Sequence, residues 1–434
     1  MPSEIITLEG HIIDSRLLPT VLDEVLALNG TFEIKELLIG TKHEDASFAS
    51  IIVEASDEAT LEKIIDRVQQ HGANRAKVED AKLVQADVDG AFPPGFYSST
   101  NLETEIRVDG KWIPVERTEM DCGVVFEDGR FRTIAMSDVK RGMQIVMAGT
   151  GIKVNPLEKP QGADRQAFEF MSSDVSSEKP KALLVEQVAN QMREVKESGK
   201  RILWVAGPAV VHTGSGPDLC ALIRAGYVDA LFAGNGVAAH DIESHMFGTS
   251  LGVYLEQGIP AEHGHEHHIR AINEIRRHGS FEKAIEAGVF KGGIVYHLVK
   301  HKADYIFGGS VRDDGPLPDV ESDMLEVQRK LRDIIWGDSP NGDGQLIGYC
   351  IVVGTMLHGI ATGNCLPASV PLVCVDINQA TVTKLMDRGS FQSMGIITDV
   401  GLFIRELAEA LAPKEVQDPR DTATETTIAS QMHQ

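Results

Sequence analysis

The stretch "CIVVGTMLHGIATG", residues 350–363, decides how the larger half of the chain folds. It begins with a continuous apolar run, turns at Gly354-Thr355 and continues in small residues that allow a helix to approach a sheet closely. A short apolar run that ends in glycine is typical of a strand buried on both faces of a parallel sheet. The stretch therefore predicts a strand–turn–helix unit inside an α/β domain.

Asp376 extends this interpretation from the fold to a ligand. It ends the next strand-like run, "PLVCVDI" (371–377), at about 20 residues after Thr355. In a Rossmann unit an acid at about this distance binds the ribose hydroxyls of NAD and disfavours the 2′-phosphate of NADP. The turn does not contain GxGxxG, so an ordinary βαβ unit with Asp376 as a helix cap remains the alternative.

Other runs of the same kind place residues 182–412 in one α/β domain. They are separated by helix-like segments, as a doubly wound parallel sheet requires, and they read "RILWVAG" (201–207), "DALFAG" (229–234), "DYIFGGS" (304–310) and "SMGIITDV" (393–400). Ligands of such open sheets bind at the carboxyl ends of the strands. We therefore expect the functional residues to follow these runs.

The N-terminal part of the chain has a different pattern. Residues 1–95 alternate in the order βαββαβ, the ferredoxin-like arrangement, with the last strand predicted within "AKVEDAKLVQA" (76–86). Residues 96–160 contain short strands and the turn signals Asp109-Gly110 and Asp128-Gly129, which predict a small β-barrel or meander. Polar residues 161–181 are interpreted as a linker, and residues 413–434 as a disordered tail.

Composition excludes several classes of partner. A net charge of −23 argues against nucleic acid or an anionic membrane surface as the main partner. The five cysteines form no CxxC pair, which argues against a zinc ribbon or a disulfide framework. Neither a signal peptide nor an apolar run of membrane-spanning length is present in the sequence, so we expect a cytoplasmic protein.

Histidines and carboxylates follow two of the predicted strands. The stretch "VAGPAVVHTGSGPDL" (205–219) predicts a strand, a second apolar step at 209–211, and a glycine-rich turn beside His212 that could cradle an anion. The stretch "FAGNGVAAHDIE" (232–243) places His240, Asp241 and Glu243 near the start of a helix. These side chains are candidates for acid–base catalysis, and stabilisation of the helix start is the alternative for the two acids.

Two polar clusters invite a metal interpretation that we do not favour. In "HGHEHH" (263–268) pairs of histidines have helical spacing, but no HExxH motif or cysteine ligand accompanies them, so surface or interface histidines are expected. In "VRDDGPLPD" (311–319) Asp313, Asp314 and Asp319 could bind Mg²⁺, but adjacent acids rarely face one ion and Arg312 can neutralise them. We expect no metal, and a fixed loop near a ligand.

Four longer stretches carry a resemblance to a known family. They are "GPAVVHTGSGPDLCALIRAGYVDALFAGNGVAAHDIE" (207–243), "FGTSLG" (247–252), "GHEHHIRAINEIRRHGS" (264–280) and "GSVRDDGPLPDV" (309–320). Together they resemble the LOR/SDH-domain family, which includes archaeal-type ornithine cyclodeaminases and the C-terminal part of cyanobacterial arginine dihydrolase/ornithine cyclodeaminases. The resemblance covers most of the chain, and its C-terminal half is similar to the deoxyhypusine-synthase type of NAD-binding fold.

The resemblance implies an activity and a set of site residues. The activity is conversion of L-ornithine to L-proline and ammonia by transient hydride transfer to bound NAD. The implied NAD contacts are Asn235, Gly236, Asp314, Thr355, Met356, Leu357, His358, Asp376, Asp399 and Val400. For proton transfer we favour Asp241, then Glu243, with His212 or His240 as further candidates.

Two other functions stay open at this point. One is a net NAD-dependent dehydrogenase acting on an amino acid of the saccharopine or lysine type. The other is a non-catalytic regulator that senses an amino acid or NAD, because the N-terminal unit resembles ligand-sensing modules. A homodimer or homotetramer is the expectation for an enzyme of this size.

Overall fold

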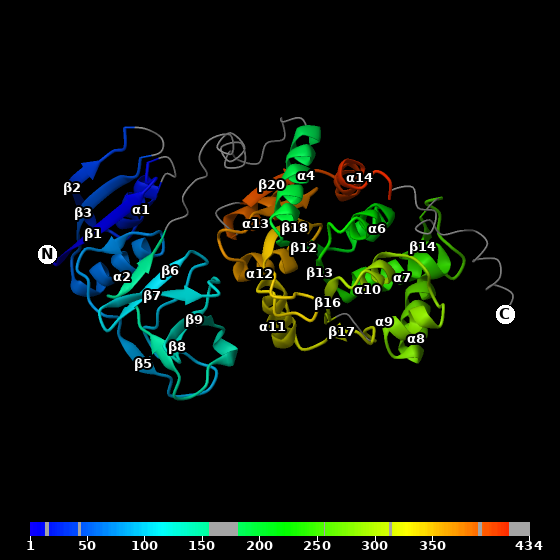
Figure 1. The fold of residues 1–434 in the computed structure, drawn as a ribbon, viewed down its shortest axis with the longest axis horizontal. Coiled ribbons are helices and arrows are strands. Elements are labelled where there is room, and N and C mark those ends of the chain that lie inside the picture. The colour runs from blue at the N-terminus through cyan, green and yellow to red at the C-terminus, as the bar shows by residue number, and fades with distance from the viewer. Residues whose placement is uncertain are drawn as a thin grey trace. The chain divides into compact units, whose positions relative to one another are not determined.

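The computed structural model describes residues 1–13, 17–41, 45–155, 181–255, 257–311, 315–388 and 393–415. The chain forms two compact units (Figure 1). One unit holds residues 1–170 together with 364–369, and the other holds residues 171–363 and 370–434. The predicted linker (161–181, save its last residue) and most of the predicted tail (413–434) lie outside the described residues.

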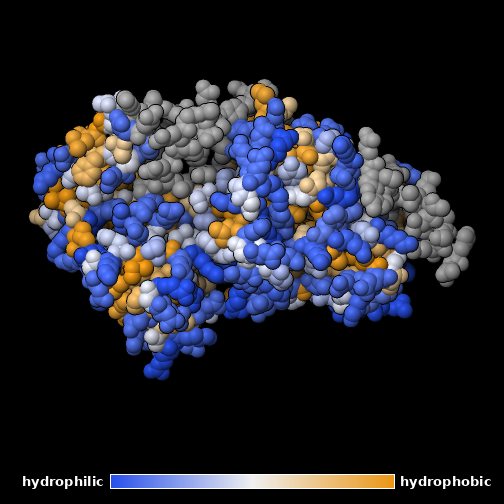
Figure 2. Space-filling view, in the orientation of Figure 1, coloured by the Kyte–Doolittle hydropathy of each residue, from blue (hydrophilic) through white to orange (hydrophobic). Residues whose placement is uncertain are grey.

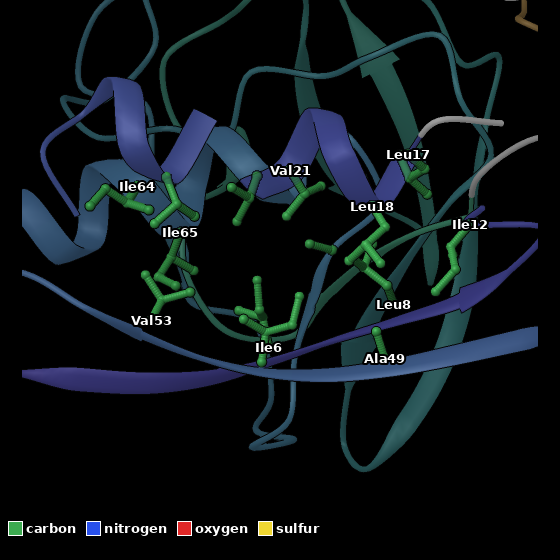
Figure 3. Close-up of a cluster of buried hydrophobic side chains, with 14 of the residues drawn as sticks. Ile6, Leu8, Ile12, Leu17, Leu18, Val21, Ala49, Val53, Ile64 and Ile65 are labelled. Atoms are coloured by element: carbon green, nitrogen blue, oxygen red, sulfur yellow. The ribbon is translucent and has the colours of Figure 1, made fainter. Parts of the chain in front are cut away.

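The first sheet of the N-terminal unit is antiparallel and has the order β2-β3-β1-β4. Every second side chain of β3 is buried, because helices cover only one face of this sheet. Figure 3 shows the resulting core, in which Ile6 and Val53 from the strands meet Val21 and Ile65 from the helices. The elements are β1 (Ser3–Gly10), α1 (Leu17–Ala27), β2 (Thr31–Leu38), β3 (Ser47–Glu54), α2 (Glu58–Gln69) and β4 (Asn74–Arg75).

The second sheet of this unit has seven strands in the order β11-β6-β7-β9-β8-β10-β5. Both predicted Asp-Gly turns form, with positive φ at Asp109 and Asp128 as well as at the glycines that follow them, as two-residue hairpin turns require. The strands are β5 (Leu83–Gln85), β6 (Thr104–Val108), β7 (Lys111–Glu116), β8 (Gly123–Glu127), β9 (Arg130–Ile134), β10 (Gln144–Val146) and β11 (Ile152–Val154).

The strand predicted within residues 76–86 is a point of difference. The first sheet ends instead with the two-residue β4, which pairs with β1 at Ile6 and Thr7. Residues 83–85 form β5 and pair with β10 in the second sheet, where Leu83 packs against the core. The segment contains a strand, as its apolar pattern predicts, but packing against the second core decides which strand it pairs with.

Residues 364–369 complete the N-terminal unit from far along the sequence. The Ala368 amide donates to the Asn101 carbonyl at 2.8 Å, and the Met120 amide donates to the Asn364 carbonyl at 2.8 Å. Ala368 is buried in the same hydrophobic cluster as Tyr97 and Phe131. This segment is therefore a core element of a unit that is otherwise built from the first part of the chain.

The second unit confirms the predicted α/β domain with a parallel sheet. Its seven strands are all parallel and have the order β17-β16-β13-β12-β18-β19-β20. Apart from the short β17, this is the Rossmann order in which the chain starts in the middle and fills first one side and then the other. The strands are β12 (Arg201–Ala206), β13 (Ala230–Gly234), β16 (Asp304–Gly308), β17 (Val320–Glu321), β18 (Ile347–Val353), β19 (Leu372–Asp376) and β20 (Ser393–Ile397).

Helices cover both faces of this sheet, which is why β12 and β18 are buried along their whole length. Crossovers between parallel strands are right-handed. The connections between strands on one side of β12 therefore lie on the opposite face of the sheet from the connections between strands on the other side. Helix α6 contacts α10 and α14, and α14 contacts α4 (Figure 1). The helices are α4 (Lys181–Glu197), α5 (Ala209–His212), α6 (Gly216–Arg224), α7 (Asn235–Phe247), α8 (His267–His278), α9 (Phe281–Glu286), α10 (Ile294–Lys300), α11 (Met324–Ile335), α12 (Leu357–Cys365), α13 (Gln379–Arg388) and α14 (Val400–Leu411).

A buried ion pair joins the amino ends of two of these strands. Arg201 begins β12 and Asp304 begins β16, and their side chains are 2.5 Å apart with at most 5% of either residue exposed. The Arg201 guanidinium also donates to the Asp229 carbonyl, while Ser339 and Asn341 donate to the Asp304 carboxylate. Each charge is thus hydrogen-bonded as well as paired, as burial demands.

The surface is mostly hydrophilic. Hydrophilic residues predominate on the face that Figure 2 presents, with apolar residues in scattered patches. Among the described helices, none combines the length and the apolar character needed to cross a bilayer.

Candidate active site

Most of the predicted functional residues that the structure describes follow strands of the parallel sheet, whose carboxyl ends lie in register at one edge. Ala206 of β12 pairs with Ala233 of β13 on one side and with Val353 of β18 on the other. Asp376 of β19 pairs with Ile397 of β20. Each predicted turn follows one of these strand ends, so they all face the edge at which open sheets bind their ligands.

The two glycine turns singled out in the sequence lie side by side. A Cβ atom on Gly207 would lie 1.9 Å from the Gly354 carbonyl oxygen, so only glycine allows the backbones after β12 and β18 to approach this closely. Gly354 also has a φ of +60°, which favours glycine. This contact lies at the topological switch point of the sheet. After β12 the chain adds β13 and β16 on one side, whereas after β18 it adds β19 and β20 on the other side.

The turn after β12 begins with a short helix. Residues 209–211, the second apolar step of the sequence, belong to the single helical turn α5, which buries Val210 and Val211. The following turn is internally bonded, because the buried Ser215 hydroxyl donates to the Val210 carbonyl. A Cβ atom on Gly401 would lie 3.0 Å from the Thr213 hydroxyl oxygen, so this turn lies against the start of α14.

His240 and Glu243 form a hydrogen-bonded pair on α7. The His240 Nδ1 and Glu243 Oε2 atoms are 2.8 Å apart, and the Glu243 side chain is fully buried whereas His240 is partly exposed. The Thr249 hydroxyl and the Gly252 amide donate to Glu243 Oε1 at 2.9 and 3.0 Å. Burial works to raise the pKa of Glu243, but the hydrogen bonds from His240, Gly252 and Thr249 outweigh it and lower the pKa.

His212 brings a second imidazole to this pair. The His212 and His240 rings meet edge to face with their centroids 4.9 Å apart, and His212 Nδ1 is 2.8 Å from the Ser250 hydroxyl. Burial lowers the pKa of His212, and the neighbouring His240 lowers it further. His212 is therefore held neutral near pH 7, where it can donate or accept a hydrogen bond. The structure thus brings together His212, His240 and Glu243 from α5 and α7.

Asp241 lies in a different environment from its neighbours. It is only 1% exposed, and its two carboxylate oxygens accept hydrogen bonds from the Ile294 and Val295 amides at 2.9 Å each. Gly293 has a φ of +99°, and a Cβ atom there would lie 2.8 Å from Asp241 Oδ2, so backbone closes around the carboxylate. Burial raises the pKa of Asp241. These contacts suit an anchor for α10 better than a group that meets substrate.

Among the predicted cofactor residues, Asp376 and Asp399 end neighbouring strands. Asp376 is partly exposed, and its Oδ1 accepts from the Asn378 amide at 2.8 Å. Asp399 is exposed and caps α14 by accepting from the Leu402 amide at 2.9 Å. Val400 is buried at the start of α14.

The remaining predicted cofactor residues follow β13 and β18. Asn235 is buried and its side-chain oxygen accepts from the Leu317 amide at 3.1 Å, while Gly236 lies near Pro208. His358 packs across the sheet edge against Phe232, with ring centroids 4.7 Å apart, and burial lowers its pKa. Thr355 and Met356 are partly exposed and Leu357 is exposed. Asp314 lies outside the described residues.

The sequence interpretation missed three polar residues of this site, Thr249, Ser250 and His267. The first two form the short strand β14 (Thr249–Ser250), which pairs with β15 (Val253–Tyr254) and brings both buried hydroxyls to the histidines. Their one signal was the family stretch "FGTSLG". His267 belongs to the HGHEHH cluster, but within the described part of the chain no three His, Cys, Asp or Glu side chains are arranged to hold a metal ion.

Comparison with family models covers nearly the whole chain. Residues 3–102 match the LOR/SDH bifunctional enzyme conserved region. Residues 103–185 match the first region of the C-terminal part of arginine dihydrolase ArgZ-like proteins, and residues 186–407 match the Rossmann fold of the same part.

Individual proteins that are similar to this chain include full-length relatives and solved structures. An ornithine cyclodeaminase of Methanothermobacter thermautotrophicus is 46% identical over 401 residues, which cover 92% of this chain and 95% of that protein. The apo crystal structure of ArgZ, an arginine dihydrolase from the ornithine-ammonia cycle in cyanobacteria, has a TM-score of 0.81 at 34% identity and covers 94% of this chain and 58% of that chain. The ternary complex of AgrE with ornithine and NAD⁺ has a TM-score of 0.50 at 38% identity and covers 94% of this chain and 57% of that chain.

Proposed function

The chain belongs to the family that joins the LOR/SDH conserved region to the ArgZ-like C-terminal domains, and on this premise we propose that it is an NAD-dependent ornithine cyclodeaminase. Its reaction is the conversion of L-ornithine to L-proline and ammonia. The observation that carries the proposal is the 46% identity, over nearly the full length of both proteins, to an ornithine cyclodeaminase. A related protein also binds ornithine and NAD⁺ together.

The carboxyl edge of the sheet suits NAD. Asp376 has one carboxylate oxygen bonded to its own turn, and in the described residues no partner occupies the other, so it can accept from a ribose hydroxyl. The start of α14 offers backbone amides to the phosphates. We assign the cofactor to Asn235, Gly236, Asp314, the Thr355–His358 turn, Asp376, Asp399 and Val400. When bound, NAD⁺ takes two electrons from the substrate's α-carbon and later returns them, so the reaction is not a net oxidation.

His240 is the group best placed to move protons. Because the Glu243 carboxylate accepts from His240 Nδ1, the other ring nitrogen, Nε2, is left with its lone pair when the ring is neutral. His240 can then take a proton from a substrate ammonium at Nε2, and return it when ammonia leaves. Glu243 fixes the ring and stabilises the imidazolium, while His212 supplies a neutral hydrogen-bonding group beside it.

For Asp241 we propose a supporting role in place of direct proton transfer. Its carboxylate holds the start of α10 through the Ile294 and Val295 amides, and it precedes Glu243 by two residues on the same helix. It therefore fixes the helix that carries His240 and Glu243. The catalytic set that we propose is His240 with Glu243 and His212, supported by Asp241.

Three finer expectations accompany the proposal. The absence of GxGxxG and the family resemblance support an NAD-binding domain of the deoxyhypusine-synthase type. Enzymes of this size favour closed symmetric assemblies, which supports a homodimer or homotetramer. An acidic chain with five free buried cysteines suits the reducing cytoplasm.

Incubation of the purified protein with L-ornithine and catalytic NAD⁺ tests the proposal. We expect proline and ammonia in equal amounts with no net rise in NADH absorbance. Stoichiometric NADH would support the dehydrogenase alternative instead. Failure to turn over ornithine or related amino acids, despite intact NAD binding, would support the regulator.

Replacement of Asp376 by alanine should weaken NAD binding while leaving the fold intact. The carboxylate caps only its own turn and is partly exposed, so its removal costs little folding free energy but removes a charge-assisted hydrogen bond to the ribose. We expect the Kd for NAD⁺, measured by titration calorimetry, to rise by about 10-fold or more. Asp57→Ala, which removes the exposed acid that caps α2 in the N-terminal unit, serves as the control for loss of a helix-end acid outside the cofactor site. An unchanged affinity in Asp376→Ala would remove Asp376 from the cofactor site.

A further inference from the structure

Three hydrogen bonds link the candidate base to His267, which the proposed catalytic set does not include. His240 Nδ1 meets Glu243 Oε2 at 2.8 Å, the Thr249 hydroxyl donates to Glu243 Oε1 at 2.9 Å, and the same hydroxyl oxygen is 2.8 Å from His267 Nδ1. The chain of bonds runs from α7 through β14 to the start of α8. It draws in one member of the HGHEHH cluster that the proposed function leaves unused.

The direction of each bond follows from counting hydrogens. The Thr249 hydroxyl has one hydrogen, and Glu243 as a carboxylate can only accept, so that hydrogen is directed to Glu243. His267 Nδ1 must therefore be the donor to the Thr249 oxygen. In the same way His240 Nδ1 must donate to Glu243. The bonds thus fix both tautomers, with Nδ1 protonated in His267 and in His240.

Packing restricts Glu243, Thr249 and His267, the later members of this chain of hydrogen bonds. Glu243 and Thr249 are fully buried, so water does not compete for their hydrogen bonds. The His267 ring stacks on Phe247 with centroids 4.7 Å apart and an interplanar angle of 19°, which holds the orientation of the ring. If His267 were absent, the Thr249 hydroxyl would still donate to Glu243, but it would lose the donor that polarises it and strengthens that bond.

We propose that Thr249 and His267 are positioning residues for His240, acting through Glu243. This inference rests on the proposed function, because it takes His240 as the group that exchanges protons with ornithine. By donating to the Thr249 oxygen, His267 strengthens the bond from the Thr249 hydroxyl to Oε1, which disperses part of the carboxylate charge. The Gly252 amide also donates to Oε1, whereas Oε2 accepts from His240 and from the Leu251 amide. The result is an imidazole of fixed orientation whose basicity is moderated by two residues that need not touch substrate.

The test compares Thr249→Val with Thr249→Ser. Valine keeps the shape of threonine but removes the hydroxyl, whereas serine keeps it. We expect Thr249→Val to lower kcat by about 10-fold or more with little change in the KM for ornithine, because it affects the geometry of proton transfer and not binding. Thr249→Ser should stay within about twofold of the parent protein.

The pH profile gives a measurement that a purely structural role would not move. His240 faces Glu243 on α7, His212 on α5 and His268 on α8. Without the Thr249 donor, Glu243 carries a less dispersed charge and favours the His240 imidazolium more strongly. The pKa on the acidic limb of the kcat profile should therefore rise in Thr249→Val and also in His267→Ala.

A double variant and a neighbouring histidine complete the experiment. If the two residues act along one chain, Thr249→Val with His267→Ala should be no slower than Thr249→Val alone. His265, 79% exposed in the same cluster, is the control, and His265→Ala should leave kcat and the pH profile unchanged. Additive losses, or an unshifted acidic limb in Thr249→Val, would overturn the inference. Because NMR titration of the His240 ring needs no turnover, it tests the same pKa shift even if ornithine proves not to be the substrate.

Discussion

Replacing His240 with asparagine should lower kcat for proline formation by about 10²–10⁴-fold, the range associated with loss of a general acid–base group. Asparagine can still donate an amide hydrogen to Glu243 at the position of Nδ1, so the buried carboxylate keeps a partner. It cannot exchange a proton near neutral pH. The variant therefore separates the chemical role of the imidazole from its structural role.

Three measurements identify the cause of this loss. The melting temperature and the Kd for NAD⁺ should stay close to those of the parent protein, because neither the buried network nor the cofactor residues change. His240→Ala should be similarly slow, but free imidazole should restore part of its rate by entering the space that the ring vacates. If His240→Asn kept a kcat within a factor of about three of the parent, His240 would not be the base.

Replacing Arg201 with methionine should lower the free energy of unfolding by about 3–5 kcal/mol. The change leaves the Asp304 carboxylate buried with only neutral donors from Ser339 and Asn341, and removes the hydrogen bond to the Asp229 carbonyl. The site lies at the amino ends of β12 and β16, opposite the catalytic edge. Denaturation by urea, followed by circular dichroism, measures the loss.

The matched control removes both charges together. Arg201→Met combined with Asp304→Leu should recover much of the lost stability, because an apolar pair of similar volume has no uncompensated charge to bury. Both variants should retain NAD binding below their unfolding transitions. A single variant as stable as the parent would mean that water reaches this carboxylate and that the pair contributes little.

The parallel sheet could be predicted because it depends on local patterns. Residues 202–206 and 350–353 are apolar throughout and each run is followed by glycine, a pattern that few structures other than a buried strand explain. The conformation of residues 209–211 could not be predicted in the same way, because three apolar residues fit one turn of buried helix as well as a strand. Residues 83–85 show a related limit, since a strand pattern does not name its partner.

The same distinction between local patterns and long-range pairing applies to the residues of the site. Glu243 and His240 could be found because polar residues directly follow a predicted strand. Thr249 and Ser250 could not, because their role depends on a two-residue strand that returns to α7 and has no periodic pattern. Asp241 illustrates an ambiguity of the sequence, since a carboxylate at the start of a helix looks the same in sequence whether it meets substrate or backbone.

The late contribution of residues 364–369 has a consequence for biosynthesis. The N-terminal unit buries Ala368 in its core and bonds Asn101 and Met120 to this segment. A ribosome must therefore translate most of the second unit before the first can close, although domains usually fold in the order of their synthesis. Nascent chains stalled before residue 364 should expose this part of the core to protease and to chaperones, and those stalled well beyond residue 369 should not.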